Sequence, residues 1–336
     1  MSTTASARPI RTVDLPCTHC GGTDDAVLYT GREHEYTTTT DAPFDVVRCA
    51  GCGLVRLNPR PDVSELGRIY PPEYYAYHLV RADADARPGL GERLKMRMYQ
   101  RRLRSLLGRL GRDGPVRLLD VGCADGRLLD WYKAGPDGAR LETHGIEMSE
   151  AAAATARSRG HRVVTGRFEV DDELEPGTFD VILAYHVIEH VDDPVRFTRR
   201  AAELLAPGGL FVVATPNYDS WDVRRFRQHW GGNHFPRHWT FYDAHSAEDL
   251  ARRVGLDLDR VEYQVNPVFW VWSMHSWLLA RFPRSRWPDR LFPPVSVFLP
   301  SVRSFVLLSA FTTVDLLQRL LTRRTASMSV ELRKPA

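Results

Sequence analysis

The stretch 118–132, LLDVGCADGRLLDWY, decides the fold of this chain. An apolar run that ends at Asp120 is followed by a loop with two glycines, Gly122 and Gly126, and then by a segment with helical spacing. In α/β proteins such a loop joins a buried strand to a helix, at the edge of the sheet where nucleoside-containing ligands bind. Glycine suits this loop because a ligand that lies against the backbone leaves no room for a Cβ atom.

The sequence around this stretch alternates apolar runs with helical patterns. We expect strands near 116–121, 141–147, 161–165, 179–185, 208–215, 256–264 and 326–333. Strands that alternate with helices of about 10 to 15 residues favour right-handed βαβ connections and a parallel sheet that is covered on both faces. The sequence therefore predicts an α/β fold, with a doubly wound, Rossmann-like and mostly parallel sheet of seven strands, over 92–265 and 326–334. An amphipathic helix over 92–111 leads into it.

A carboxylate at the end of the second expected strand is a further sign of a nucleoside. Glu147 follows Gly122 by 25 residues, in LETHGIEMS. A carboxylate there can accept hydrogen bonds from both hydroxyls of a ribose. The alternative is an acidic N-cap for the next helix. The loop GCADG has no third glycine, and no GxxxxGK[ST] pattern occurs, so a nucleoside with a zwitterionic tail is favoured over a pyrophosphate ligand.

Four motifs, in this order, resemble those of class I S-adenosylmethionine (SAM)-dependent methyltransferases. They are DVGCADG, IEMS, FDVILAYHVIEHVDDP and LLAPGGLFVVATPN, and the resemblance extends over about 92–264. The loop departs from the commonest family pattern at Ala124, where a second glycine is usual. The resemblance implies that the protein transfers a methyl group from SAM to an acceptor.

The same resemblance implies a set of cofactor-binding residues. They are Asp120, Gly122, Cys123, Gly126, Glu147, Met148, Phe168 and Tyr185. By this resemblance Gly122, Cys123 and Gly126 wrap the methionine part of SAM. Glu147 holds the ribose, and Met148 and Phe168 lie beside the adenine.

Methyl transfer to a hydroxyl or to an acidic carbon needs a base, and histidine titrates near neutral pH. Tyr185 and His186 end the fourth strand, where the resemblance implies that they face the methyl group and the substrate. His190 lies four residues later, in a segment that is often structural in the family. His234 and His238 belong to the long loop after the fifth strand, which covers the substrate in this fold. We treat Tyr185, His186, His190 and His238 as catalytic candidates, and a purely structural role as the alternative for each histidine.

Two cysteine pairs precede the α/β region. CTHCGG at 17–22 and CAGCGL at 49–54 together form C-x2-C-x28-C-x2-C. The four expected metal ligands are Cys17, Cys20, Cys49 and Cys52. Four thiolates suit tetrahedral zinc, and a closed shell leaves no position for a reacting water, so the zinc would be structural. A redox pair is the alternative, but it would lie at the start of a helix and would not need a second copy.

The remaining segments are predicted from their composition. We expect a disordered tail over 1–14, a zinc ribbon over 15–61 and a linker over 62–91, whose tyrosines could pack on a neighbour. Residues 266–325 hold four of the eight tryptophans and predict a helical, hydrophobic insertion before the last strand. It would cap the substrate side of the sheet, or rest on a membrane or a partner subunit. Prolines and Arg303 interrupt the apolar stretch 291–321, so a spanning helix is not expected, and peripheral membrane contact through 291–321 is one of the alternatives left open.

A zinc ribbon joined to this kind of core resembles bacterial methyltransferases of sugar, cell-surface or secondary-metabolite pathways. The resemblance implies a small-molecule acceptor, or one linked to a lipid or a carrier, with an oxygen or carbon nucleophile. The N-terminus has no apolar signal segment, so a cytoplasmic protein with membrane association left open is expected.

Two other functions are weighed against small-molecule methylation. The first is an RNA methyltransferase or RNA-binding protein that uses the zinc ribbon. A net charge of only +3 and a ribbon with few basic residues argue against a nucleic-acid partner. The second is a scaffold with the SAM-binding fold but without transfer activity. The sequence does not predict the oligomeric state.

Overall fold

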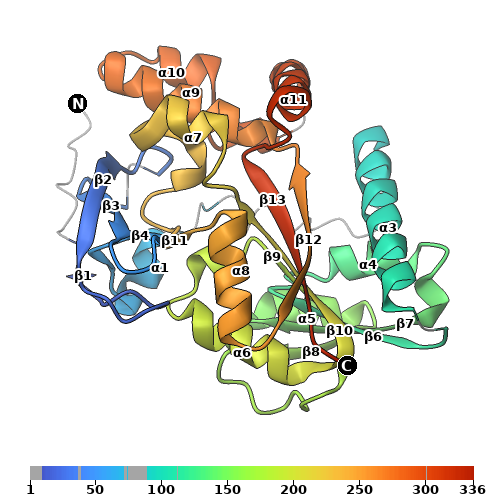
Figure 1. Ribbon diagram of the computed structural model, residues 1–336. Helices are drawn as coiled ribbons and strands as arrows, with labels where there is room; N and C mark the ends of the chain where they lie inside the picture. Colours follow the sequence, from blue (N-terminus) through green and yellow to red (C-terminus); the bar gives the residue numbers. More distant parts are fainter. Residues whose placement is uncertain (1–9, 37–38, 72–73, 75–88, 112, 300) are drawn as a thin grey trace.

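The computed structural model describes residues 10–36, 39–71, 74, 89–111, 113–299 and 301–336. A seven-stranded sheet forms its centre, in the order β12-β13-β10-β9-β6-β7-β8 (Figure 1). The strands are β6 (Val116–Val121), β7 (Leu141–Glu147), β8 (Arg162–Thr165), β9 (Phe179–Tyr185), β10 (Leu205–Pro216), β12 (Asp257–Gln264) and β13 (Ser327–Arg333). β13 runs antiparallel to β10 and β12, and the other neighbouring strands are parallel. The predicted Rossmann-like, mostly parallel sheet of seven strands is confirmed.

Helices cover both faces of this sheet, as Figure 1 shows. One layer comprises α3 (Leu90–Leu110), α4 (Arg127–Lys133) and α5 (Glu150–Ser158), and the other comprises α6 (Pro194–Leu204) and α8 (Ala244–Arg253). Successive residues of a strand point to opposite faces. In β9, Val181 and Leu183 therefore pack with the first layer, whereas Ile182 and Ala184 pack with the second. A strand between two helical layers has to be apolar along its length, which is why FDVILAY could be recognised in the sequence.

The predicted helix over 92–111 is α3, and only its C-terminal half is buried. Leu103, Leu106 and Leu107 lie in the core, but Leu94 and Met98 are more than half exposed. The amphipathic helix predicted over 92–111 is thus present. The N-terminal half of α3 extends beyond the sheet and the other helices (Figure 1), so its apolar residues find no cover among the described elements.

A second sheet of four strands lies beside the first, in the order β11-β4-β3-β2. Its strands are β2 (Asp25–Arg32), β3 (Pro43–Cys49), β4 (Val55–Leu57) and β11 (Thr240–Phe241). β2 and β3 form a hairpin that ends at the second cysteine pair. β11 comes from the long loop after β10 and pairs antiparallel with β4, through Thr240 opposite Arg56 and Phe241 opposite Val55. No pattern in the sequence predicts this two-residue strand, which joins the N-terminal sheet to the α/β region.

The prediction of a disordered tail over 1–14 is wrong for its last five residues. β1 (Thr12–Val13) pairs antiparallel with β5 (Arg60–Pro61), and Ile10 is buried. The Leu15 amide also donates to Asn58 Oδ1 at 3.1 Å. These partners lie about 45 residues away, so local composition could not indicate them. The rest of the predicted tail, 1–9, lies outside the described residues.

The predicted linker is also structured where it is described. Residues 62–71 contain η1 (Val63–Glu65) and α1 (Leu66–Ile69), and Asp62 accepts a hydrogen bond from the Ser64 amide as the N-cap. Ile69 and Tyr74 are buried. The segment packs on the α/β region, as its tyrosines suggested. Residues 72–73 and 75–88 lie outside the described residues.

The segment before β13 is helical. It contains α9 (Pro267–Arg281), α10 (Trp287–Leu291), η6 (Ser296–Phe298) and α11 (Val302–Thr322). The prolines that interrupt the apolar run precede α11, so the long apolar helix starts at Val302 and not near Leu291 as the run suggested. The remaining short helices are η2 (Gly138–Arg140), η3 (Ile188–His190), α7 (Trp221–Phe226), η4 (Arg227–His229) and η5 (Gly231–Asn233).

Candidate active site

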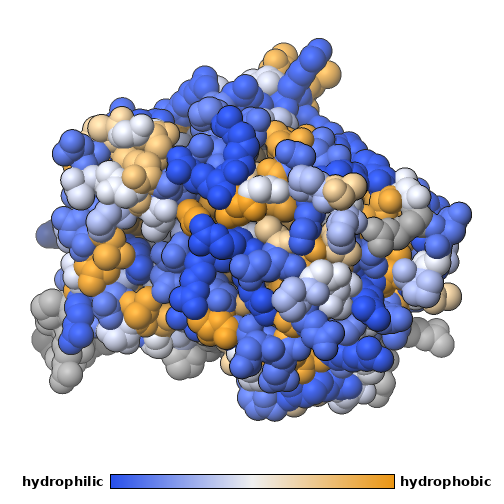
Figure 2. Space-filling view, turned by 60° about the horizontal axis from the view of Figure 1, so that its bottom comes forward, coloured by the Kyte–Doolittle hydropathy of each residue, from blue (hydrophilic) through white to orange (hydrophobic). Residues whose placement is uncertain are grey.

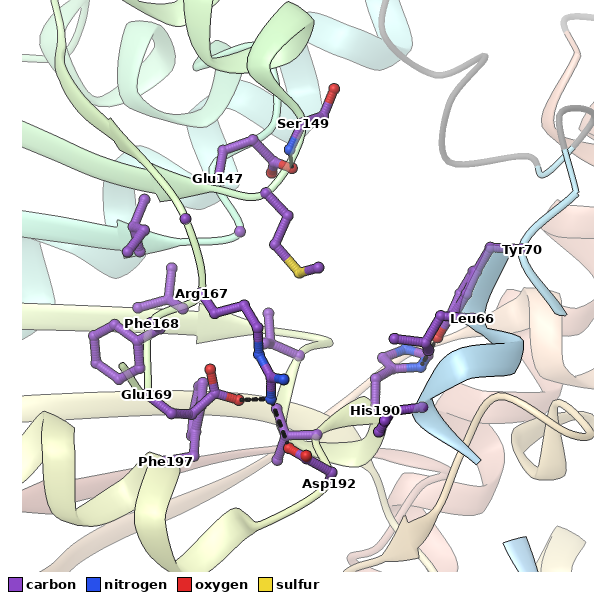
Figure 3. A pocket seen from close by; sticks show the side chains of 18 of the residues that line it. Leu66, Tyr70, Glu147, Ser149, Arg167, Phe168, Glu169, His190, Asp192 and Phe197 are labelled. Atoms are coloured by element: carbon purple, nitrogen blue, oxygen red, sulfur yellow. Dashed lines mark hydrogen bonds and ion pairs between the residues drawn. The ribbon is translucent and has the colours of Figure 1, made fainter. Parts of the chain in front are cut away.

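A cavity of ≈ 520 Å³ lies at the carboxyl ends of β6, β7, β8 and β9. This edge of a parallel sheet is where α/β folds bind their ligands, and the volume suits a small molecule. The loops after these strands line it, together with Val63, Leu66, Gly67, Tyr70 and Tyr74. In Figure 3, Glu147 and Ser149 face Leu66, Tyr70 and His190 across the open space.

Two backbone amides hold the carboxylate of Glu147 in the cavity wall. Its Oε1 accepts from the Ser149 amide at 2.9 Å, and its Oε2 accepts from the Ala124 amide at 3.1 Å. Each carboxylate oxygen retains lone pairs for a further hydrogen bond. Glu147 is thus oriented in advance as an acceptor at the end of β7.

Ala124, the departure from the usual family loop, has a backbone conformation that favours glycine. Its φ is +49°, in the left-handed region that costs an alanine roughly 1–2 kcal/mol relative to glycine. The same residue donates the amide hydrogen bond to Glu147. The strained residue, Ala124, is therefore the one whose backbone amide orients Glu147 in the cavity wall.

The loop glycines act at two different places. Gly122 has a φ of +73° and lines the cavity, and a Cβ there would lie 3.2 Å from Val187 Cγ2. Gly126 has a φ of +79°, and a Cβ there would lie 2.8 Å from His161 and 3.0 Å from the Ala156 Cβ. Gly122 leaves room in the cavity, whereas Gly126 lets α4 start close to α5.

Of the eight predicted cofactor residues, half line the cavity. They are Gly122, Glu147, Met148 and Phe168. Gly126 lies under α5, and Asp120 and Cys123 are buried beneath the loop. Burial, with the nearby Glu147 charge as the second cause, raises the pKa of Asp120 to about 7.

Tyr185 turns away from the cavity, although the sequence suggested that it faces the methyl group. Its ring lies 6.2 Å from the Tyr99 ring, and its hydroxyl lies 3.5 Å from that of Tyr132. Arg102 of α3 lies over its ring. Burial raises the pKa of Tyr185 to about 12, so the hydroxyl stays protonated and is a poor base near neutral pH.

His186 lies outside the cavity lining as well, with its side chain 46% exposed. Its Nδ1 is 3.1 Å from Oε1 of the buried Glu189. Burial alone would raise the pKa of Glu189, but the hydrogen bond from His186 and the neighbouring histidines lower that pKa to about 2. His186 therefore forms a hydrogen bond with the ionised carboxylate of Glu189, beneath the site.

His190 is the one histidine that lines the cavity in the part of the chain that the structure describes. Its Nδ1 lies 3.1 Å from the Arg237 carbonyl oxygen and 2.9 Å from the Tyr70 hydroxyl. Because a carbonyl oxygen only accepts, Nδ1 carries the proton and Nε2 carries the lone pair. Burial lowers the pKa of His190, so the ring is neutral near pH 7. A neutral imidazole with a free lone pair can accept a proton.

His238 lies behind His190 and not in the cavity wall. The two rings are T-shaped, with their centroids 4.6 Å apart, and His238 Nδ1 lies 2.8 Å from the Gly232 carbonyl oxygen. Burial lowers the pKa of His238 well below its usual value. Its long loop does cover the site, but this side chain supports His190 from the interior. The ligand atoms of Glu189, His190 and His238 lie within 4.8 Å of one another, so they could alternatively hold a metal ion.

A sequence profile described as a methyltransferase domain matches residues 94–261, half of the chain. The chain belongs to this methyltransferase family. A ubiquinone biosynthesis O-methyltransferase from Cereibacter sphaeroides is 34% identical over 170 residues, which cover 47% of this chain and 68% of that protein. The enzyme of the same name from Ruegeria pomeroyi is 32% identical over 182 residues, 49% of this chain and 71% of its own.

Solved methyltransferase structures resemble the chain more distantly. Phosphoethanolamine N-methyltransferase 2 from Haemonchus contortus, solved with SAM, has 16% identity and a TM-score of 0.47. The match covers 93% of this chain and 69% of that one. Family and relatives together identify the protein as a class I SAM-dependent methyltransferase.

The cavity of this methyltransferase fits SAM. Gly122 leaves space that a Cβ would fill, and Glu147 presents a carboxylate that backbone amides already orient. Met148 and Phe168 contribute apolar surface to the same wall. These are the groups that would hold a nucleoside with its ribose at Glu147.

The methyltransferase cavity also contains residues that the sequence did not single out. Arg167 forms ion pairs with Asp192 at 2.8 Å and with Glu169 at 3.6 Å, as Figure 3 shows. Tyr70 comes from the segment before the α/β core, and Trp239 comes from the long loop after β10. The tyrosines of IYPPEYY were a sequence signal for Tyr70. No sequence pattern indicated Arg167 or Asp192.

A buried ion pair fixes the wall that carries Tyr70. Arg237 Nη2 lies 2.5 Å from Glu33 Oε2, and both side chains are at most 1% exposed. Arg237 Nε also donates to the carbonyl oxygen of Ile69, the residue before Tyr70. Nearby, Nδ1 of His234 lies 2.8 Å from an oxygen of Glu35. The hairpin loop of the N-terminal sheet is thereby tied to the loop after β10 and to α1.

The four N-terminal cysteines of the methyltransferase come together as the sequence predicted. All four Sγ atoms lie within 4.8 Å of one another, with Cys17 to Cys52 and Cys20 to Cys49 at 3.5 Å. A disulfide needs about 2.05 Å, whereas four sulfurs around one zinc lie about 3.8 Å apart. The glycines that follow the pairs, Gly21 and Gly53, both have a positive φ, as two equal knuckles require. The cluster could hold a metal ion.

Proposed function

We propose that this methyltransferase transfers the methyl group of SAM to a hydroxyl oxygen of a small acceptor with an apolar ring, and that His190 is the general base. The observation that carries the proposal is that His190 and Glu147 lie in opposite walls of one cavity. The relatives named ubiquinone biosynthesis O-methyltransferases support oxygen as the nucleophile.

Bound SAM would supply an electrophilic methyl group on a positively charged sulfur. His190 Nε2 would take the proton of the acceptor hydroxyl as the methyl group passes to oxygen, and the sulfur of SAM would keep the electron pair of the S–C bond. The Arg237 carbonyl and Tyr70 keep the proton of Nδ1 in place and so fix which nitrogen acts. Alignment of the acceptor hydroxyl with the methyl group would supply much of the rate.

The lining of the cavity favours an apolar ring over a sugar. Val63, Leu66, Val191 and Trp239 line the cavity with apolar surface. A sugar would bury several hydroxyls against these side chains without partners, which is costly. A sugar or a cell-surface glycan precursor, the acceptor that the N-terminal domain suggested, is therefore the second candidate.

We further propose that Cys17, Cys20, Cys49 and Cys52 bind one structural zinc ion in a zinc ribbon. The two symmetric knuckles and the convergence of four sulfurs support this assignment. The ribbon contributes to the cavity only indirectly, because Glu33 in its hairpin loop forms the ion pair with Arg237.

A substrate panel and one substitution test the proposal. Transfer of labelled methyl from SAM is measured to a dihydroxybenzoate, a prenylated dihydroxybenzoate, a nucleotide-linked hexose and bulk RNA. We expect transfer to the aromatic acceptors. His190→Gln should lower kcat by roughly 10²–10⁴-fold, while the affinity for S-adenosylhomocysteine, measured by calorimetry, stays unchanged.

The control is His245→Gln, which changes an exposed histidine of α8. Transfer only to the hexose or to RNA would overturn the acceptor class. Binding of S-adenosylhomocysteine without transfer to any acceptor would favour a scaffold. A larger loss in His186→Gln or His238→Gln than in His190→Gln would overturn the choice of base. A second bound metal ion that His190→Gln and His238→Gln both remove would make these residues ligands instead.

The pH profile gives a separate check. The base must be neutral to act, and burial lowers the pKa of His190 below 6.5, its ordinary value. The groups packed around it are Tyr70, His186, Glu189, His234, Arg237 and His238. We therefore expect kcat/KM to fall as the pH drops through a value below 6.5 and to stay level from there to pH 7. A fall that begins above pH 7 would contradict a buried histidine base.

A further inference from the structure

The long helix α11 lies on the protein with its polar residues inward. Its buried residues are Ser304, Asp315 and Gln318. Asp315 accepts hydrogen bonds from the Asn266 amide at 2.7 Å and from Trp270 Nε1 at 2.6 Å. A helix on a soluble protein normally buries its apolar stripe. These polar contacts fix α11 in the opposite orientation.

The apolar residues of α11 consequently face outward. They include Val302, Phe305, Val306, Val314, Leu316, Leu317, Leu320 and Leu321, and Val302 and Leu321 are each 82% exposed. Phe311, which stacks on Trp270, is a half-buried exception. By contrast, Figure 2 shows a face on which hydrophilic residues predominate and hydrophobic residues form separate patches. A continuous apolar surface of this kind is typical of an interaction site.

The charge around α11 indicates the kind of partner. Residues 281–324 carry eight arginines and two aspartates, a net charge of +6, whereas the whole chain has +3. The rest of the chain is therefore net negative. All eight arginines are exposed, and one of the two aspartates, Asp315, is buried. A second copy would bring like charges together, but a membrane with acidic headgroups would attract this surface.

Exposed aromatic residues lie in the same basic segment. Trp287 is 66% exposed and Phe282 is 52% exposed. Tryptophan is favoured at the boundary between headgroups and acyl chains, because its ring is both apolar and a hydrogen-bond donor. Arginine side chains can extend from the same depth to the headgroups.

Contacts with the rest of the protein hold α11 near both of its ends. These contacts indicate that the helix lies on a membrane and does not cross it. In the part of the chain that the structure describes, it is the one helix long and apolar enough to cross a bilayer. Near its start, Arg303 donates to the Arg290 carbonyl, and near its end Gln318 donates to Asp222 at 2.9 Å. A crossing helix would lose these contacts with the folded body. An amphipathic surface helix keeps them.

We propose that α11, together with residues 281–292, seats the protein on the surface of a membrane that contains anionic lipids. The outward apolar residues enter the boundary of the acyl chains, and the arginines contact the headgroups. The polar inner side stays on the protein. This surface is separate from the methyl-transfer cavity, so it does not depend on the acceptor proposed above.

Sedimentation with vesicles tests the proposal on the full chain. Vesicles of phosphatidylcholine alone are compared with vesicles that also contain phosphatidylglycerol. We expect binding to the anionic vesicles, which added salt weakens. Leu320→Glu/Leu321→Glu should reduce this binding by about tenfold or more. Arg284→Glu/Arg286→Glu should reduce it as well, and should reduce its dependence on salt.

The matched control is Leu94→Glu/Met98→Glu, which places the same two charges on exposed apolar positions of α3. It should bind vesicles as the unchanged protein does, and all variants should bind S-adenosylhomocysteine normally. Absence of vesicle binding would overturn the proposal, as would an equal loss in the control. A dimer in solution that Leu320→Glu/Leu321→Glu dissociates, without binding to vesicles, would show that a second copy covers α11 instead.

Discussion

The seven-stranded sheet and the N-terminal sheet are held in place by different interactions. β9 lies between two helical layers and contributes apolar residues to both. The N-terminal sheet also has an apolar cluster, which includes Phe44, Val46 and Leu57. In addition it has four converging cysteines, the Arg237–Glu33 ion pair and the two residues of β11. Apolar contacts alone hold β9 between its helical layers, whereas the second region combines apolar contacts with a few charged or metal-ligating groups that no neighbour can replace.

This difference has an energetic consequence. Burial of an apolar side chain adds a modest amount at each position, so no single position decides the central sheet. When a buried charge or a metal ligand is removed, its partner charge or the metal site stays behind without the group that balanced it. Neighbouring contacts cannot make up for this loss. The N-terminal region should therefore respond far more strongly to single substitutions, and three experiments compare the two regions.

The largest effect is expected at the cysteine cluster. If the four cysteines bind zinc as proposed, Cys49→Ser should abolish zinc binding and unfold the N-terminal sheet, since structural zinc contributes on the order of 10 kcal/mol to small domains. Metal analysis and hydrogen exchange of β2 to β4 measure this. β6 and β9 should stay protected from exchange.

Cys123→Ala is the matched control, because Cys123 is equally buried but lies in the α/β region. It should keep the zinc. Full zinc content in Cys49→Ser, or its loss in Cys123→Ala, would contradict the assignment of the metal site.

The second effect concerns the buried ion pair. Arg237→Met should lower the free energy of unfolding by about 3–5 kcal/mol, because it leaves Glu33 and Glu35 buried without their cation. Urea denaturation measures this. Arg253→Met, which removes a partly exposed pair with Asp249, should cost less than about 1 kcal/mol. Equal losses in the two variants would mean that the buried pair has no special role.

The smallest effect is expected in the central sheet. Ile182→Val removes one methylene between β9 and the helical layer of α6 and α8, and it should cost about 0.5–1.5 kcal/mol. The same denaturation assay applies. A loss as large as that of Arg237→Met would show that the central sheet also depends on single residues.

The same contrast explains what could be predicted from the sequence. Apolar runs such as FDVILAY report burial on both faces directly, so the strands and their parallel arrangement could be recognised. The cysteine pairs could be recognised because a metal needs fixed spacing. β11 and the pairing of β1 with β5 could not, because each depends on a partner distant in sequence and has only two residues.

The site was predictable in part for the same reason. Gly122 and Glu147 occupy fixed places after two strands, so the loop pattern located them. The sequence could not show which histidine is the base, because His186, His190 and His238 carry the same chemistry. In the structure, only His190 of these three lines the cavity. The wall with Leu66 and Tyr70 comes from a segment whose composition resembled a linker.

The position of β13 has a consequence for the order in which the protein is made. β13 lies between β10 and β12, although it follows both in the chain. A ribosome adds about 5–20 residues per second, so β12 emerges before the strand that will join it to the sheet. Until residues 327–333 pair with both neighbours, β10 presents an open edge and β12 stays apart from the sheet. An open strand edge can pair with another chain, so the step that inserts β13 is the one at which this sheet is most exposed to aggregation.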